Sequence, residues 1–446
     1  MQKNIFHKTS DIQEESTQNL LGVCKKALDL PPPSACGPVA VAMSGGVDSS
    51  TIAAVLKHLG YTVIGMTLRL YTPSKTSEES PKSGTCCAGR DILDAKAVAH
   101  RMGFSHYVLD YEEKFRRGVM NPFVESYAKG ETPIPCVLCN QTVKFSDLLK
   151  QAKDLGCCAL VTGHYVQRIR QGKHVYLHRG VDPVRDQSYF MFATKKNELL
   201  DARFPLGGLL KTQTRKLAAH FQLNVAKKKE SQDICFVGGG KYTDVLKKLD
   251  PNSFKPGPLV NLSGDVLGVH KGIAAYTVGQ RRGIGIASKD PLFVVKIEPA
   301  HNRVVVGPRS ALLTKALYIR DINWLWHDDA VLPNTLHVRL RSSGVLLKAR
   351  IALDPQSKTA FVLLCEGQSG IAKGQACVFY NENCVLGGGT ILETVPCLES
   401  MAPHKDINRE NILWTKTSTK KRTEPKMPAH KIDGSKTTGA DISLAS

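Results

Sequence analysis

Residues 39–50 read VAVAMSGGVDSS, an apolar run that ends in a serine–glycine bend and continues into a helix. The run at 39–43 has the length and residue types of a buried strand. Glycines in the bend let the backbone approach an anion closely, and serine hydroxyls and the open N–H groups of a helix start supply donors. An ordinary glycine-rich turn is the alternative, but the full SGGVDSS after an apolar strand favours a phosphate loop. The lysine of a kinase-type loop is absent, so that kind of site is excluded.

Strands and helices alternate outward from this loop. A second strand is predicted at 61–70, a helix at 91–102 and a third strand at 107–109. A helical face at 145–155 precedes a strand at 158–162. This repetition predicts an α/β fold with a doubly wound, mainly parallel sheet and helices on both sides. Beyond about residue 250, short Val- and Leu-rich segments separated by turns predict an antiparallel barrel or sandwich.

The chain is therefore expected to hold a catalytic domain, two smaller domains and two extensions. Polar residues and three prolines dominate its start, and Lys, Thr and Ser dominate its end. The predicted limits are 1–36 for a flexible extension, 37–242 for the α/β domain that contains the phosphate loop, 243–308 for a central linking domain, 309–397 for an antiparallel β-barrel and 398–446 for a basic disordered tail.

Composition narrows the class of partner and compartment. Lys and Arg number 60 against 40 Asp and Glu, and this excess of 20 positive charges favours a polyanionic partner. No apolar run reaches about 18 residues, so no membrane span or membrane partner is expected. The polar start predicts no signal or transit peptide, and a cytoplasmic location is expected. Thirteen cysteines in a reducing compartment indicate buried thiols, metal ligands or reactive thiols rather than a disulfide framework.

Cys136 and Cys139 form a C-x-x-C segment just before the helical face at 145–155. Cys139 is therefore predicted at or near a helix N-terminus, where the dipole lowers the pKa of a thiol. Structural zinc is the alternative, because C-x-x-C commonly binds metal. A second C-x-x-C segment is missing from the sequence, and its adjacent cysteine pairs suit tetrahedral ligation poorly, which disfavours zinc.

A second isolated thiol, Cys235, lies in the polar stretch ESQDICF at 230–236. Alone it would be assigned to the core. Paired in function with Cys139, it supplies what thiolation requires, which is one thiol to carry sulfur as a persulfide and another to attack that persulfide and release the sulfur.

The loop resembles the pyrophosphate loop of the ATP pyrophosphatase family, whose members cleave ATP between the α and β phosphates. With the further motifs, residues from about 39 to about 392 resemble the tRNA-specific 2-thiouridylase family. Besides the loop and the two cysteine segments, these motifs are TGHY at 162–165, RDQSYF at 185–190, YTVGQRRGIGI at 276–286 and GQACVFY at 374–380. The resemblance implies an adenine nucleotide α-hydrolase-like catalytic domain.

The resemblance also implies the roles of individual residues. Cys139 is expected to be the nucleophile and Cys235 to carry the persulfide, with the two joined as a disulfide after sulfur release. The expected nucleotide site comprises Ala42, Met43, Ser44, Gly45, Gly46, Val47, Asp48, Ser49, Leu68 and Gly163. The expected tRNA contacts are Ile134, Pro135, Cys136, His164, Arg185, Asp186, Gln187, Arg339, Leu340 and Gln375.

Two positions depart from the family pattern. Ile134 stands where the family commonly has Asn, so a side-chain hydrogen bond to the target base is lost there. Cys136 stands where some members have Asp, and it can act as an acid or base only as a thiol or thiolate.

The implied reaction is ATP-dependent adenylation of C2 of the wobble uridine, position 34 of tRNA, followed by sulfur transfer that gives 2-thiouridine, AMP and pyrophosphate. Mg²⁺ is the expected cofactor, and the expected partners are tRNA and a sulfur-donor relay protein that supplies persulfide sulfur. The enzyme is expected to be a monomer.

Three alternatives stay open at the level of sequence. An amidating ligase of the same superfamily would need neither cysteines nor tRNA. An iron–sulfur cluster held by Cys136, Cys139 and Cys235 would replace persulfide chemistry. A basic RNA-binding module without catalytic activity would leave SGGVDSS unexplained.

Overall fold

The structure, a computed structural model, describes residues 16–71, 89–229, 234–237, 240–327, 336–354 and 356–396. The predicted tail at 398–446 and the first fifteen residues of the predicted extension lie outside these ranges, as do the cysteine pair at 86–87 and the segment at 230–233.

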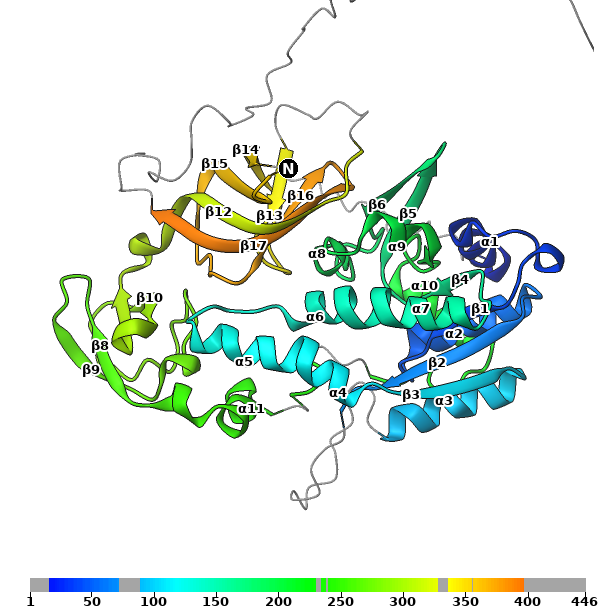
Figure 1. Cartoon of the computed structure of the whole chain (residues 1–446), viewed down its shortest axis with the longest axis horizontal. Coiled ribbons are helices and arrows are strands. Elements are labelled where there is room, and N and C mark those ends of the chain that lie inside the picture. The colour runs from blue at the N-terminus through cyan, green and yellow to red at the C-terminus, as the bar shows by residue number, and fades with distance from the viewer. Residues whose placement is uncertain are drawn as a thin grey trace, which may run out of the picture. The chain divides into compact units, whose positions relative to one another are not determined.

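A five-stranded, fully parallel sheet forms the centre of the catalytic domain (Figure 1). Its order is β3-β2-β1-β4-β7, and Val39 of the central strand β1 pairs with Val63 on one side and Ala159 on the other. The strands are β1 Val39–Ala42, β2 Val63–Arg69, β3 Ser105–Asp110, β4 Ala159–Val161 and β7 Ala202–Arg203.

Helices cover both faces of this sheet, as predicted. Val39 and Val41 are buried in one hydrophobic cluster with α2 (Val47–His58) and α10 (Lys211–His220), whereas Ala40, between them, is buried in a second cluster. Successive side chains of a strand point to opposite faces, so the two clusters lie on opposite sides. The other helices of this domain are α3 Gly89–Met102, α4 Glu112–Phe115, η2 Arg116–Met120, α5 Asn121–Ala128, α6 Pro135–Leu138, η3 Cys139–Leu148, α7 Leu149–Asp154, α8 Ser188–Met191 and α9 Lys196–Asp201.

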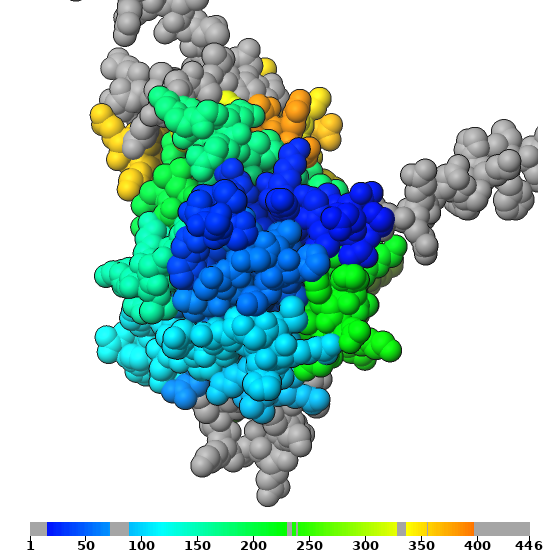
Figure 2. All heavy atoms as spheres, turned by 90° about the vertical axis from the view of Figure 1, so that its right-hand side faces the viewer, coloured from blue at the N-terminus to red at the C-terminus, as the bar shows by residue number. Residues whose placement is uncertain are grey.

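The N-terminal segment differs from the flexible extension that the sequence predicts. Residues Thr17–Leu28 form helix α1, and the side chain of Ser16 caps it by accepting a hydrogen bond from the backbone of Asn19 at 3.3 Å. One side of α1 is buried in the same cluster as α2, and the dark blue residues in Figure 2 lie directly on the catalytic domain. Its buried residues are Leu20, Leu21, Cys24 and Leu28, an apolar stripe at helical spacing that explains the docking.

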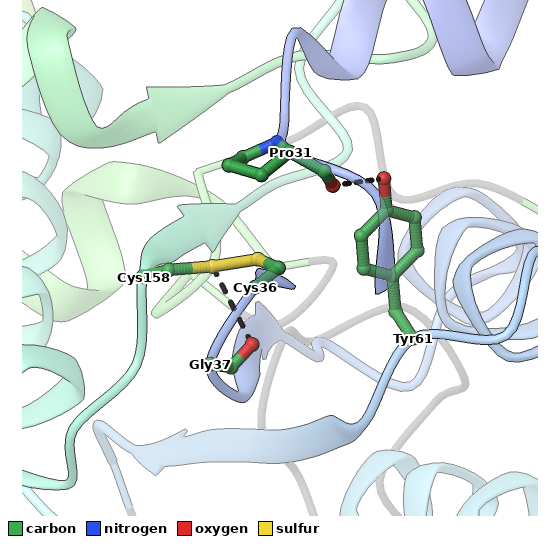
Figure 3. Close-up of a disulfide and its surroundings, with 5 residues drawn as sticks. All are labelled: Pro31, Cys36, Gly37, Tyr61 and Cys158. Carbon is green, nitrogen blue, oxygen red and sulfur yellow. Dashed lines mark hydrogen bonds between the residues drawn. A yellow bond between two sulfur atoms is a disulfide. The ribbon is translucent and has the colours of Figure 1, made fainter. Parts of the chain in front are cut away.

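A disulfide joins Cys36 to Cys158 (Figure 3). Cys36 precedes β1 and Cys158 precedes β4, and because these strands are neighbours in a parallel sheet, the two Cα atoms lie 6.5 Å apart. Nearby, the hydroxyl of Tyr61 donates to the carbonyl of Pro31 at 2.9 Å, which holds the same segment from the other side. The sequence predicted no disulfide framework, and this pair was not foreseen, because the pairing depends on strand order, which the sequence pattern did not reveal.

Removing this crosslink is expected to destabilise the catalytic domain. The disulfide closes a chain of 122 residues, and such a crosslink removes entropy from the unfolded state that is worth about 2–4 kcal/mol. Urea unfolding with and without a thiol reductant measures the difference. The variant Cys36→Ser should unfold at the lower midpoint in both conditions, and equal midpoints for the oxidised and reduced wild type would contradict the expectation.

A linking domain follows the catalytic domain. Helix α11 (Tyr242–Leu249) leads into a four-stranded sheet of order β10-β11-β8-β9, whose core contains Leu259, Val294 and Val304. The strands and short helices are η4 Pro251–Phe254, β8 Gly257–Val260, β9 Val266–His270, η5 Ile273–Ala275, β10 Phe293–Glu298, η6 Pro299–His301, β11 Arg303–Gly307 and η7 Arg309–Leu312.

Six antiparallel strands form the C-terminal barrel, which closes through pairing of β12 with β17. This arrangement confirms the predicted barrel. Its strands are β12 Leu313–Trp324, β13 Leu336–Arg339, β14 Leu347–Asp354, β15 Thr359–Ser369, β16 Ala376–Asn381 and β17 Cys384–Pro396.

A hairpin of the catalytic domain extends the barrel sheet. Strands β5 (Val166–Gln171) and β6 (His174–Arg179) pair with each other, and β6 also pairs with β17 through Leu177 and Val385. The two domains therefore share one continuous run of backbone hydrogen bonds. None of the helices in the described ranges is long and apolar enough to cross a membrane.

Candidate active site

The serine–glycine bend lies at the carboxyl end of β1, the edge at which ligands bind in open α/β sheets. Ser49 accepts a hydrogen bond from the backbone of Ser44 at 3.2 Å and donates to the carbonyl of Gly46 at 3.3 Å, which closes the bend into a compact loop. Gly46 is the N-cap of α2 and has no side chain to cover the first N–H groups of the helix. The loop thus presents open N–H groups and hydroxyls at the positive end of a helix dipole.

Two glycines are required by close packing around the loop. Gly45 has φ +70°, and a Cβ there would lie 2.1 Å from the carbonyl oxygen of Asp91 in α3. Gly163 follows β4, and a Cβ at that position would lie 3.0 Å from the Cβ of Asp48 and 3.3 Å from the nitrogen of Ser49. Of the expected nucleotide residues, these two allow the neighbouring strands and helices to approach the loop closely.

Most of the other expected nucleotide residues have side chains that are buried rather than open to a ligand. Val47 and Met43 are buried in the core, and Leu68 of β2 is buried on the opposite face of the sheet. Ala42 is half-buried at the end of β1. The hydroxyl of Thr67 donates to the carbonyl of Met43 at 2.8 Å and thereby fixes the residue before the loop.

Asp48 is bound by groups that the sequence did not single out for this purpose. Lys211, the first residue of α10, donates to both carboxylate oxygens of Asp48 at 2.7 and 2.8 Å. The hydroxyl of Tyr165 donates to the same carboxylate at 2.8 Å and lies 2.9 Å from the hydroxyl of Thr214. The loop lacks a lysine of its own, but a distant helix supplies one. No local motif signals Lys211, whereas Tyr165 belongs to the TGHY motif.

The helix that carries the C-x-x-C segment begins earlier than predicted. Pro135 is the first residue of α6, which runs directly into η3, so Cys136 lies in the first turn and Cys139 one turn further on. Cys139 therefore lies near the helix N-terminus but one turn inside it, and Cys136 is the cysteine closer to the positive end of the dipole. Pro135 fixes this start, because proline is preorganised for the first helical position.

The charge of Lys144 acts on both Cys136 and His164. Burial lowers the pKa of His164 well below its usual value, and the Lys144 ammonium lowers it further, so its imidazole is neutral at pH 7. Solvent reaches Cys136, yet the surrounding protein raises the pKa of its thiol, and Lys144 opposes that rise. His164 also bonds through Nδ1 to the hydroxyl of Thr162 at 2.7 Å, and its ring packs at a tilt against that of Phe145, 5.8 Å apart between ring centres. Lys144 was not predicted from the sequence.

Cys139 and Cys235 border the same hydrophobic cluster. Cys139 is buried within it, and Cys235 is half-buried and packs against it. The residue after Cys235, Phe236, packs edge-on against Phe115 and Phe123 at 5.7 and 5.2 Å between ring centres. Phe236 thereby anchors Cys235 against α4 and α5, in the cluster that also holds Cys139.

Several expected tRNA contacts lie between the barrel and the catalytic domain. The Asp186 carboxylate is fully buried and binds Arg179 and Arg339 at 3.1 and 3.0 Å. Gln187 accepts from the backbone of Tyr165 at 2.9 Å, and Gln375 donates to the carbonyl of Thr132 at 2.9 Å. Asp186 and Gln375 thus join the catalytic domain to the barrel, and Gln187 braces Tyr165 within the catalytic domain.

The remaining expected contacts vary in exposure. Leu340 is buried in the barrel core, whereas Arg185 and Ile134 are half-buried. Residues 131 and 132, just before Ile134, contact the barrel. Glu131 pairs with Arg320 at 3.0 Å, and the backbone N–H of Thr132 donates to the carbonyl of Lys373 at 2.7 Å.

Family models match the chain along most of its length. The tRNA methyl transferase HUP domain matches residues 37–239, the tRNA methyl transferase PRC-barrel domain matches 243–308 and the aminomethyltransferase beta-barrel domain matches 314–391. The tRNA-specific 2-thiouridylase MnmA of Rhodospirillum centenum is 52% identical over 371 residues, 81% of this chain and 93% of the relative. The MnmA of Brucella melitensis biotype 1 is 50% identical over 378 residues, 82% of this chain and 92% of the relative.

The chain belongs to the tRNA-specific 2-thiouridylase family. Among solved structures, the 2-thiouridylase chain is similar to the U34-tRNA thiolase NcsA from Methanococcus maripaludis with its [4Fe-4S] cluster. The match has a TM-score of 0.33 and 18% identity, and it covers 52% of this chain and 73% of that one. A likeness at this level carries no argument about chemistry.

The side chains around the 2-thiouridylase loop do not fit a preformed magnesium site. The three nearby carboxylates are each paired with a lysine: Asp48 with Lys211, and Asp91 and Asp94 with Lys228. Among the residues that the structure describes, no group of three His, Cys, Asp or Glu side chains could hold a metal ion. The same holds for the iron–sulfur alternative, because Cys136, Cys139 and Cys235 do not form such a group. We therefore derive no step through a metal.

Proposed function

We propose that this 2-thiouridylase is an ATP-dependent sulfurtransferase that converts the wobble uridine of tRNA, position 34, into 2-thiouridine. The observation that carries the proposal is the placement of Cys139 and Cys235 on one hydrophobic cluster within the domain that holds the SGGVDSS loop. An amidating ligase would need neither thiol, and identity of about 50% to curated 2-thiouridylases over most of the chain speaks against that alternative.

The first proposed step is adenylation. ATP lies with its phosphates on the loop, where the backbone N–H groups and the hydroxyls of Ser44 and Ser49 stabilise the negative charge that develops on the leaving pyrophosphate. The target uridine is flipped out of its stack, because its C2 carbonyl is otherwise out of reach. The carbonyl oxygen attacks the α-phosphate, pyrophosphate leaves, and C2 now carries AMP as a good leaving group.

The second proposed step is sulfur transfer. Cys235 carries the sulfur as a persulfide, and the Cys139 thiolate attacks the Sγ atom of Cys235, so that the bond from Sγ to the outer sulfur breaks. A Cys139–Cys235 disulfide forms and hydrosulfide is released; the hydrosulfide attacks C2, and AMP leaves. In a direct variant, the outer sulfur of the persulfide attacks C2 first and AMP leaves. Cys139 then attacks Sγ of Cys235, which breaks the S–S bond and releases the thiolated base. A thiol reductant reopens the disulfide in both variants.

The proposal assigns the neighbouring groups to the target base. Neutral His164 offers a hydrogen-bonding nitrogen rather than a charge, and Lys144 places a positive charge next to Cys136. We further propose that a relay protein supplies the persulfide sulfur, that the enzyme is a monomer and that it works in the cytoplasm, where a reducing environment keeps catalytic thiols available. Mg²⁺ would have to be held largely by the ATP phosphates, since the carboxylates near the loop are paired.

Mass spectrometry of tRNA nucleosides tests the proposed function. The enzyme is incubated with unmodified tRNA, ATP, Mg²⁺ and cysteine persulfide as the sulfur source, and a parallel reaction omits ATP. The proposal expects 2-thiouridine at position 34 only when ATP is present. Product formation without ATP would overturn it. Iron content and visible absorption of anaerobically purified protein separate the persulfide mechanism from the iron–sulfur alternative.

Affinity for tRNA is expected to fall steeply with salt. The chain carries 20 excess positive charges, and neutralising tRNA phosphates with Lys and Arg releases bound counterions. If six or more phosphates are contacted, affinity should drop by about 10³-fold between 50 and 200 mM salt. Fluorescence anisotropy with labelled tRNA gives the slope, and an affinity that is flat over this range would exclude a grip based on phosphates.

A further inference from the structure

Lys228 contacts the phosphate loop from a segment remote in sequence. Its ammonium donates to the carbonyl oxygen of Gly45 at 3.0 Å and to Asp91 at 2.6 Å, and it also pairs with Asp94. Asp91 and Asp94 belong to the first turns of α3, and the lysine lies in the turns that follow α10. None of the motifs that mark the family includes Lys228.

The backbone that carries Lys228 is itself held in place. The guanidinium of Arg215 in α10 donates to the carbonyl of Ala226 at 2.6 Å and to that of Lys228 at 3.1 Å. The side chain of Lys228 is one-quarter exposed, so protein surrounds most of it. The ammonium therefore contacts Gly45 from a backbone that is held in place by hydrogen bonds.

The geometry of a trans peptide gives this contact a consequence for phosphate binding. The carbonyl of Gly45 and the N–H of Gly46 belong to one planar unit and point in opposite directions. When Lys228 holds the carbonyl on the side of α3, the N–H of Gly46 points to the other side. That N–H is the first of the open groups at the start of α2, where the phosphates are proposed to bind.

The charges around Lys228 speak against direct binding of phosphate by its ammonium. Burial lowers the pKa of Lys228, but hydrogen bonds to Asp91 and Asp94 outweigh that effect and raise it overall, so the ammonium stays protonated. Two carboxylates already face its one positive charge. Little charge is therefore left to attract phosphate, and what remains distinctive is the hydrogen bond to Gly45.

We propose that Lys228 is a positioning residue that orients the Gly45–Gly46 peptide, so that the N–H of Gly46 faces the pyrophosphate end of ATP. This inference rests on the proposed function of the loop. The residue acts through the backbone of the loop and does not touch the reacting atoms.

Calorimetric titration of the full chain with ATP, and separately with pyrophosphate, tests the inference. Lys228→Met should weaken both affinities by about ten-fold or more, since a hydrogen bond from a charged donor is lost. Lys228→Arg, which retains a charged donor, should restore part of the affinity. The matched control is Lys227→Met, which removes an equal charge from an exposed neighbouring position and should bind both ligands like the wild type. Thermal unfolding of each variant shows whether it is folded.

A triple variant separates orientation from charge balance. If Lys228 only neutralised Asp91 and Asp94, then Lys228→Met combined with Asp91→Asn and Asp94→Asn would restore affinity. The inference expects the triple variant to remain weak, because Gly45 still lacks its donor. Wild-type affinity in Lys228→Met, or restored affinity in the triple variant, would overturn the inference alone. A wild type that binds neither ATP nor pyrophosphate would instead overturn the proposed function.

Discussion

Cys139→Ser should abolish thiolation and leave adenylation intact. A serine hydroxyl is not ionised near neutral pH and does not attack a persulfide, so the sulfur on Cys235 would not be released, and the rate should fall by about 10³-fold or more. The loop lies at the end of β1, whereas Cys139 is buried in a cluster on one face of the sheet, so nucleotide binding should not require the thiol. Nucleoside mass spectrometry measures thiolation, and tRNA-dependent exchange between ATP and pyrophosphate measures adenylation.

Cys235→Ser should have the same outcome, because the persulfide would then have no carrier. Cys365→Ser is the matched control: Cys365 is exposed on β15 of the barrel, and its loss should leave both activities unchanged. If either Cys139→Ser or Cys235→Ser still produced 2-thiouridine, the assigned roles would be wrong. Loss of exchange in both variants would show that the thiols act before adenylation.

Gly45→Ala is expected to have the second large effect. A methyl group at this position would lie 2.1 Å from the carbonyl oxygen of Asp91, a backbone atom that cannot rotate away, and the positive φ adds strain. The loop and the first turn of α3 must therefore separate, which moves the N–H groups from their places. We expect ATP affinity to fall by roughly 100-fold, since a backbone clash of this kind costs a few kcal/mol. Calorimetric titration with ATP measures the loss.

Gly103→Ala separates strain from collision. Gly103 ends α3 with φ +67°, almost the value of Gly45, but a Cβ there would meet nothing within 4 Å. This variant should lose about 1 kcal/mol of stability and keep its ATP affinity. Equal ATP affinity in Gly45→Ala and the wild type would mean that the loop does not hold the phosphates in the proposed way.

The sequence predicted the layers of the fold because each layer has a local signature. The apolar run at 39–43 and the helical face at 91–102 correspond to β1 and α3, and the short segments after residue 250 correspond to the sheet of the linking domain and to the barrel. Helix α1 was missed because polar residues surround its four apolar positions and mask the helical spacing. The Cys36–Cys158 bond was missed because it depends on the order of strands, which no local pattern encodes.

The candidate site could be predicted only in part. Motifs pointed to the loop and to Cys139 because in each case the characteristic residues are adjacent or nearly adjacent in the sequence. Lys211 and Lys228 reach the loop from distant turns and helices, and a single lysine has no signature in sequence. The start of the cysteine helix was misplaced because the apolar face at 145–155 is more evident than the single proline at 135 that begins the helix. The domain limits and the individual roles of the site residues stay predictions.

The hairpin of β5 and β6 bears on how this enzyme could be divided or recombined. The hairpin begins directly after Tyr165, whose hydroxyl donates to Asp48. Its second strand, β6, forms backbone hydrogen bonds with β17 of the barrel. In a chimera that exchanges the barrel at residue 308, β17 would face a hairpin that did not evolve to pair with it. Both strands would then present unpaired backbone groups at an exposed sheet edge. A functional exchange would therefore have to move residues 166–179 together with the barrel. In structural terms, the boundary between the two domains runs before this hairpin rather than at residue 308.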